Sequence, residues 1–213
     1  MESEAIAALR EEYEAAGLTE ADAGDDPVSL FVRWFDGAVA SGMHDPNAMA
    51  LATASPGAFP SVRIVLLKGF DSDGAVFYTN RESRKGDELE ANPRAALAML
   101  WHPLQRQVRI EGMVSRVSDE ESDEYFASRP RGSRLGAVAS PQSRVVADRI
   151  ELERAYDAAD ASFPGEVQRP PSWGGYRVSL ETVEFWQGRV GRLHDRIRFR
   201  AIDGHWLRER LAP

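Results

Sequence analysis

The stretch SVRIVLLKGFDSDGAVFYTNRESRK, residues 61–85, holds the side chains whose types and spacing best suit chemistry. Its four cations are Arg63, Lys68, Arg84 and Lys85. Arg63 and Lys68 bracket an apolar run rich in β-branched residues, which is typical of a largely buried strand. A charge at the border of such a strand needs a partner. The competing interpretation, a solvated surface charge, is the commoner one for any single Lys or Arg.

Ser83, Arg84 and Lys85 stand where a short helix, residues 86–91, is expected to begin; Pro93 would end it. A helix N-terminus offers free backbone N–H groups and the positive end of a dipole. A hydroxyl and two cations at that point predict an anion site with phosphate as its natural ligand.

A turn follows the apolar run. Residues 71–74, Asp-Ser-Asp-Gly, have the chemistry of a tight turn, and residues 75–79 resume a strand pattern. The sequence therefore predicts an antiparallel hairpin between residues 61–68 and 75–79.

The composition excludes several classes of protein. The chain of 213 residues has 26 Lys and Arg against 34 Asp and Glu, a formal charge of −8, which argues against a general nucleic-acid binder. It has no Cys, and its four His show no metal-ligand spacing, so we expect no metal. The acidic start is unlike a signal peptide, and no apolar run is long enough to span a membrane. We expect a cytoplasmic protein with no membrane partner.

Periodicity predicts an α+β fold. Asp26 and Pro27 begin a helix whose apolar stripe is expected to be core. Many short strands with short links favour an antiparallel, nearly closed barrel. The predicted strands cover residues 49–53, 61–68, 75–79, 95–101, 107–117, 176–180, 183–187, 197–201 and 206–207.

Helical patterns interrupt these strands. A capping box at Ser118 and an Ala-rich stretch at residues 144–162 predict a helical segment over about residues 118–163. Residues 4–16 form a short amphipathic pattern. We expect residues 1–26 to be a flexible N-terminal arm and residues 27–213 to form one barrel domain.

Two further cationic groups lie at residues 129–134 and 189–196. On composition alone the first is as easily a basic solvated loop. If the groups converge with residues 63–85, they suit two phosphorylated ligands, or one ligand with a phosphate at one end and a polar ring at the other. Gln107 and Gln142 offer amides to a heterocycle, and Trp186 could cover an aromatic face. No Walker loop or GxGxxG motif is present.

Nine segments in order resemble the pyridoxamine 5′-phosphate oxidase family, over a span from about Arg10 to Pro213. Each segment is weak alone, and the ordered set is strong. They are RIVLLK (63–68), FYTN (77–80), SRK (83–85), QRQVRIEG (105–112), YFASRPRGS (125–133), QS (142–143), WGGYRVSLETVEFWQG (173–188), RLHDR (192–196) and the terminal RLAP.

The resemblance implies an FMN-binding split β-barrel homodimer with one FMN per active site at the subunit interface. It implies oxidation of pyridoxamine 5′-phosphate and pyridoxine 5′-phosphate to pyridoxal 5′-phosphate, with O₂ reduced to H₂O₂ and ammonia released from the amine. The reaction would proceed by hydride transfer from C4′ of the substrate to N5 of the flavin.

The resemblance also implies residue roles. Arg192 and His194 would lie against the substrate at the reacting carbon. Substrate would be bound by Arg10, Tyr13, Lys68, Tyr125, Arg129, Ser133, Arg192 and His194. FMN would be held by Arg63, Ile64, Val65, Leu66, Leu67, Lys68, Tyr78, Thr79, Arg84, Lys85, Gln107, Gln142, Ser143, Trp186 and Arg196.

Two alternatives stay open. One is another flavin or deazaflavin reductase on the same barrel, which leaves YFASRPRGS and RLHDR unexplained. The other is a non-catalytic module that binds flavin or pyridoxal phosphate, which predicts tight binding without reduction of the flavin by substrate.

Overall fold

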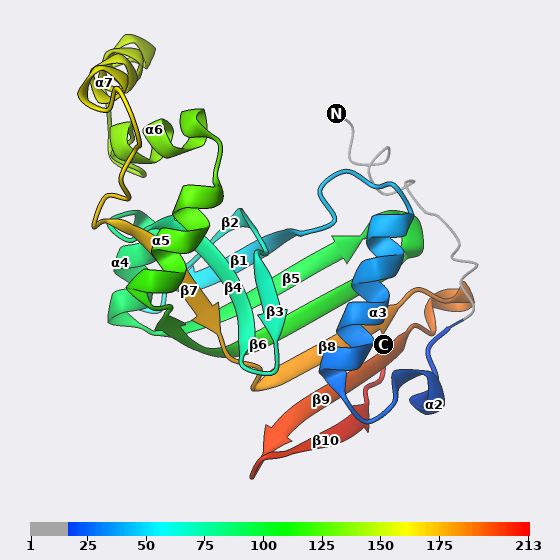
Figure 1. Cartoon of the computed structure of the whole chain (residues 1–213). Coiled ribbons are helices and arrows are strands. Elements are labelled where there is room, and N and C mark those ends of the chain that lie inside the picture. The colour runs from blue at the N-terminus through cyan, green and yellow to red at the C-terminus, as the bar shows by residue number, and fades with distance from the viewer. Residues whose placement is uncertain (1–16) are drawn as a thin grey trace, which may run out of the picture.

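The computed structural model describes residues 17–213, which form a curled antiparallel sheet with helices around it (Figure 1). Seven strands run in the order β10-β9-β8-β6-β5-β1-β2, while β3, β4 and β7 continue the sheet from β6. The strands are β1 (Ala48–Ala54), β2 (Pro60–Leu66), β3 (Gly69–Asp71), β4 (Gly74–Asn80), β5 (Arg94–Trp101), β6 (Arg106–Arg116), β7 (Trp173–Val178), β8 (Thr182–Gln187), β9 (Asp195–Ile202) and β10 (His205–Arg210). The predicted α+β split barrel is confirmed.

Helices occupy the two ends of the barrel. Short 3₁₀ turns, η1 (His102–Leu104) and η2 (Val190–Arg192), follow β5 and β8. The α-helices are α2 (Glu20–Ala23), α3 (Pro27–Ala40), α4 (Arg84–Ala91), α5 (Asp119–Ser128), α6 (Arg131–Ala139) and α7 (Arg149–Ser162). None of the helices in this part of the chain has the length and apolar character needed to cross a membrane.

Helix α3 closes one face of the sheet. It begins as predicted, because the Asp26 carboxylate accepts hydrogen bonds from the backbone N–H groups of Val28 and Ser29 and Pro27 takes the first helical position. Trp34 packs edge-on against Phe185 of β8, with ring centroids 5.3 Å apart. Both rings are buried, so the expectation that the aromatic stripe of this helix is core is confirmed.

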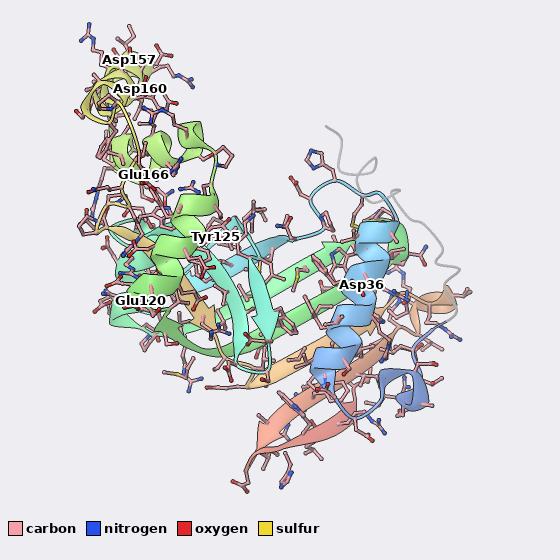
Figure 2. All side chains as sticks on the ribbon, viewed as in Figure 1. Asp36, Glu120, Tyr125, Asp157, Asp160 and Glu166 are labelled. Carbon is pink, nitrogen blue, oxygen red and sulfur yellow. The ribbon has the colours of Figure 1, made fainter. Side chains whose placement is uncertain are left out.

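A second, smaller core lies under the helices at the other end. Phe126 of α5, Leu135 of α6, Ala159 of α7 and Trp173 of β7 pack together there. Figure 1 shows α5, α6 and α7 rising in succession from this end of the sheet. Tyr125 projects from α5 on the side of the strands below it (Figure 2).

The apolar run after Ser61 differs from its prediction in two ways. β2 is the last strand of its sheet and alternates between exposed and half-buried residues, with Val62 68% and Ile64 67% exposed, so it is not a largely buried strand. It pairs with β1 rather than with residues 75–79; the hairpin around Gly74 joins β3 to β4. The turn at residues 71–74 is confirmed, but the strand paired across it is the short β3, because the strand that begins at Pro60 is interrupted at Leu67 and Lys68. Lys68 still contacts the predicted partner strand, since its backbone N–H donates to the Val76 carbonyl oxygen at 2.8 Å.

The helical segment also differs in detail. Residues 131–139 form α6, which lies within the predicted helical segment but was not expected as a separate helix. Helix α7 starts at Arg149, behind an Asp148 cap, five residues later than predicted. In the segment predicted as an arm, Leu18 and Ala23 are buried against the main core. Arg10 and Tyr13 lie outside the described residues.

The sheet changes partner along β6. The strand pairs with β8 as far as Glu111 and with β7 from Val114. Gly112 lies between these two ladders, and a Cβ atom built there would lie 1.9 Å from the backbone carbonyl oxygen of Ser179. Only glycine fits this close backbone approach.

We therefore expect Gly112→Ala to lower the free energy of unfolding by about 1 to 3 kcal/mol, because the strands must separate to admit the methyl group. Thermal unfolding of the two proteins measures the loss. Gly165→Ala is the matched control, since a Cβ atom at Gly165 meets nothing within 4 Å. Equal melting temperatures for both variants would contradict the steric explanation.

Candidate active site

A cavity of about 700 Å³ lies between β2 and β4 on one side and α5 and α6 on the other. This volume is within the usual range for small-molecule sites. Most of the residues predicted to bind cofactor or substrate line it, although they come from distant parts of the sequence. They are Arg63, Ile64, Val65, Leu66, Lys68, Tyr78, Thr79, Lys85, Tyr125, Arg129, Ser133 and Gln142.

Lys85 forms the centre of the predicted anion site. It lies in the first turn of α4, is 8% exposed, and donates through Nζ to Thr79 Oγ1 (3.1 Å), Ser83 Oγ (3.1 Å) and Gln142 Oε1 (2.8 Å). All three acceptors are neutral. Burial, and secondly the nearby positive charge of Arg63, lowers the pKa of Lys85 to about 8. This end of the cavity therefore has an excess of positive charge.

Arg63 lies beside Lys85 and is held firmly. Its Nη1 donates to the Leu51 carbonyl oxygen (3.1 Å) and to Thr53 Oγ1 (2.6 Å). Its Nη2 donates to Ser61 Oγ (2.5 Å) and reaches Glu88 Oε2 at 3.3 Å. The guanidinium group thus offers a ligand its charge and its Nε–H, while its terminal nitrogens anchor it to β1 and α4.

The other end of the cavity is aromatic. The rings of Tyr78 and Tyr125 stack with centroids 4.1 Å apart, and Trp173 stacks on Tyr78 at 5.4 Å. Lys68 Nζ lies 5.9 Å from the Tyr125 ring, and the Arg129 guanidinium carbon lies 4.8 Å from the Trp173 ring. Both cations are thus held against aromatic faces.

Arg129 has an unused donor. Its Nη1 atom is buried and has no hydrogen-bond partner among residues 17–213. Burial lowers the pKa of this guanidinium group. A buried N–H without an acceptor is unfavourable, so an anionic ligand beside Ser133, which lines the same cavity, would satisfy it.

Tyr78 is kept in its neutral form. Its hydroxyl donates to Glu121 Oε1 at 3.3 Å. Burial, followed by the negative charge of Glu121, raises the pKa of Tyr78 to about 12. The residue can therefore provide a flat ring to the cavity but cannot act as a base near neutral pH.

A second group of predicted residues lies in one row across three strands. Gln107 of β6 is opposite Trp186 of β8, and Trp186 is opposite Arg196 of β9. The Trp186 and His194 rings are 4.6 Å apart, and His194 Nδ1 accepts a hydrogen bond from the Arg189 backbone N–H at 3.1 Å. We call Gln107, Trp186, Arg192, His194 and Arg196 the sheet-end group.

Arg196 is fixed by its surroundings. Its Nε donates to Glu184 Oε1 at 2.8 Å, and its Nη1 donates to the carbonyl oxygen of Ala212 at 3.0 Å. The hydrogen bond to Glu184 raises the pKa of Arg196. Arg192 is exposed and has a positive φ of 61°, a backbone conformation that is uncommon outside glycine and is often found at functional sites.

Within one chain the two groups of residues do not meet. None of the sheet-end group lines the cavity. Figure 1 shows the orange turn after β8 at the opposite end of the sheet from α5 and α6. Leu67, Arg84 and Ser143 also stay outside the cavity wall, so their predicted contacts with a cofactor stay predictions.

Several residues near the cavity were missed by the sequence, and two of them contact predicted site residues. Trp173 lines the cavity wall, and its ring contacts the Arg129 guanidinium group. Glu88, which is 5% exposed, forms ion pairs with Arg63 and Arg84. Trp173 is an aromatic residue after a Pro-rich link, which gives little signal by itself. Glu88 occupies the helix face next to its i−4 partner Arg84, which was a usable signal. No set of three or more potential metal ligands occurs in residues 17–213.

Two protein-family descriptions match the chain. "Pyridoxamine 5′-phosphate oxidase" matches residues 35–162, and "Pyridoxine 5′-phosphate oxidase C-terminal dimerisation region" matches residues 173–213. The first contains every residue of the cavity wall except Trp173, and the second contains Trp173, β8, β9 and most of the sheet-end group.

Similar proteins agree with these matches over the full length. A pyridoxine/pyridoxamine 5′-phosphate oxidase of Nocardioides sp. is 55% identical over 208 residues, 98% of this chain and 98% of the relative. One of Rubrobacter xylanophilus is 56% identical over 209 residues, 98% of this chain and 96% of the relative. The crystal structure of PhzG from Burkholderia lata, in complex with tetrahydrophenazine-1-carboxylic acid, is 30% identical with a TM-score of 0.87 and covers 92% of this chain and 97% of its own. With the described cavity, these likenesses place the chain in the pyridoxine/pyridoxamine 5′-phosphate oxidase family of enzymes.

Proposed function

We propose that the protein is an FMN-dependent oxidase that converts pyridoxamine 5′-phosphate and pyridoxine 5′-phosphate to pyridoxal 5′-phosphate. The observation that carries the proposal is the buried ammonium group of Lys85, whose hydrogen-bond partners are all neutral, in the wall of a cavity of suitable size. Such a charge calls for an anion, and a phosphate ester supplies one.

The residues present fit FMN. The end of the cavity around Arg63 and Lys85 suits its phosphate, and Thr79 and Gln142 lie in hydrogen-bond contact with Lys85 there. FMN, when bound, supplies the acceptor for the hydride that leaves the substrate carbon and passes the electrons to O₂. The protein's task is then to bind FMN and the substrate, to orient them and to exclude water.

The end of the cavity around Lys68, Tyr125, Arg129 and Ser133 suits the substrate phosphate. Arg129 would donate through the buried Nη1 that has no partner in residues 17–213, and its contact with Trp173 keeps the guanidinium group in place. The overall reactions balance: the amine, O₂ and water give the aldehyde, ammonia and H₂O₂, while the alcohol and O₂ give the aldehyde and H₂O₂.

We infer that the active unit is a homodimer, because the sheet-end group lies away from the cavity of its own chain and all of its residues except Gln107 belong to the matched dimerisation region. In a two-fold dimer, Gln107, Trp186 and Arg196 of one protomer would meet the cavity of its partner. Arg192 would orient the substrate ring, and His194 would lie against it.

The reaction is tested by mixing FMN-loaded protein with pyridoxine 5′-phosphate without oxygen. We expect the visible flavin absorbance to bleach and to return on admission of air, with pyridoxal 5′-phosphate formed. Unphosphorylated pyridoxine is the control, since it lacks the group that Lys68 and Arg129 would bind. A flavin that stays oxidised would remove the oxidase proposal and favour a binding module or another substrate.

Mixed dimers test the division of the site between chains. Arg129→Ala and Arg192→Ala homodimers are each expected to lose most activity. A heterodimer of the two variants should recover about half of the wild-type activity per dimer, because one of its two sites then contains both arginines. Turnover of the purified heterodimer, isolated with two different affinity tags, measures this; an inactive heterodimer would mean that each site lies within one chain.

The affinity for FMN should depend on pH through Lys85. The ammonium form dominates below the pKa of about 8 and is the form that a phosphate dianion favours, so binding takes up a proton above that pH. FMN affinity should therefore be constant from about pH 7 to 8 and fall as pH rises above 8, by at most about tenfold per unit. Fluorescence titration with FMN measures the slope.

Riboflavin and a Lys85→Met variant are the controls for this dependence. Riboflavin lacks the phosphate, and Lys85→Met lacks the titrating group. Both should show a flat profile between pH 7 and 9. A wild-type FMN profile equally flat over that range would place the phosphate away from Lys85.

A further inference from the structure

A buried carboxylate lies behind the cationic end of the cavity. Glu88, on the second turn of α4, has a side chain 6% exposed and does not line the cavity. Its Oε1 accepts from Arg84 Nε at 2.9 Å, and its Oε2 lies 3.3 Å from Arg63 Nη2. One carboxylate outside the cavity wall thus joins two of the arginines predicted to bind the cofactor.

Two hydroxyl groups complete this contact. Thr53 Oγ1 and Ser61 Oγ each donate to Glu88 Oε2 at 2.5 Å. The same two oxygens accept from Arg63. Arg63 can only donate and an ionised carboxylate can only accept, so each hydroxyl accepts from Arg63 and donates its single proton to Glu88. The direction of every hydrogen bond in the ring is therefore set by the charge of Glu88.

The charge of Glu88 is secure. Burial alone would raise the pKa of this carboxyl group, but hydrogen bonds from the two hydroxyls and the two guanidinium groups outweigh burial and lower the pKa to about 2. Glu88 therefore stays ionised throughout the working range of an enzyme, and its four hydrogen bonds are charge-assisted.

We propose that Glu88 is a positioning residue for the cofactor phosphate: it holds Arg63 and Arg84 in the orientation that favours a phosphate ester over a neutral ligand. The inference rests on the proposed function, since it assigns the phosphate of FMN to this end of the cavity. Glu88 uses Nε of Arg84, so this contact leaves the two terminal nitrogens of Arg84 for other acceptors. It also ties α4, whose first turn carries Lys85, to β1 and β2.

Removal of Glu88 has two opposing effects. Loss of a negative charge raises the positive potential of the site, which would favour an anion. Loss of the hydrogen-bonded ring frees two long side chains, each of which must then be ordered when the ligand binds. Because Glu88 lies outside the cavity wall and accepts four hydrogen bonds, we expect the loss of order in the two arginines to outweigh the gain in positive potential.

The test compares FMN with riboflavin, which differ by the phosphate alone. Binding of each to the apoprotein is measured by quenching of flavin fluorescence at pH 7, where Lys85 is protonated. Glu88→Ala should weaken FMN about 10- to 100-fold and change riboflavin less than about twofold. Glu90→Ala is the matched control, because Glu90 lies on the same helix with its side chain 69% exposed and pairs with Arg116 at the surface.

Glu88→Gln covers the case in which Glu88→Ala does not fold. Its amide can accept from the hydroxyls or from Arg84, but its NH₂ end then faces a donor, so one arginine loses its partner. The expected loss of FMN affinity is intermediate. In a double-mutant cycle, Arg84→Ala should weaken FMN less in the Glu88→Gln protein than in the wild type, since Arg84 acts through the orientation that Glu88 gives it.

Each outcome decides the proposal. Selective loss of FMN affinity with a non-additive cycle supports it. An unchanged ratio of FMN to riboflavin affinity, an equal loss of both, or tighter FMN binding overturns it, the last because Glu88 would then compete with the phosphate. If the wild-type protein bound riboflavin and FMN with equal affinity, that result would overturn the proposed function itself, and the positioning role with it.

Discussion

Positive charge in a partly buried cavity is unfavourable for folding. The architecture around Lys85 depends on the hydrogen bonds that stabilise this charge. Lys85 receives only neutral partners, whereas Arg63 is held by backbone, hydroxyl and carboxylate oxygens. The cations are thus fixed without being fully neutralised. α4 is held against β1 and β2 by the same contacts, so the site and the local fold share one set of interactions.

The aromatic end of the cavity follows a different rule. Arg129 and Lys68 lie over the stacked rings of Trp173 and Tyr125, which orient cations while leaving their N–H groups for a ligand. The second, smaller core under α5 to α7 supports these rings, because Phe126 packs edge-on against Trp173. Helices that look peripheral in Figure 1 therefore help to shape the aromatic end of the cavity, while α4, β1 and β2 together shape its cationic end.

The sequence predicted what depends on local pattern. The Asp26 cap and most strand positions depend on a few neighbouring residues and were confirmed, and the short helix after Ser83 begins two residues earlier than predicted. The burial of β2 was predicted wrongly because an apolar run has the same sequence pattern whether it faces the core or the surface of a protomer. α6 was not recognised as a separate helix because Pro130 and two glycines conceal its pattern. Glu88 was missed because three of its four partners lie 25 or more residues away.

The exposed edge at β2 has a consequence for how the protein must be made. An end strand with unpaired backbone groups and outward-facing Val62 and Ile64 is the kind of surface on which other chains add strands. Newly synthesised chains are therefore most vulnerable to aggregation along this edge. Slow synthesis at moderate temperature would then favour folded protein over aggregates, because it lowers the concentration of chains that present this edge.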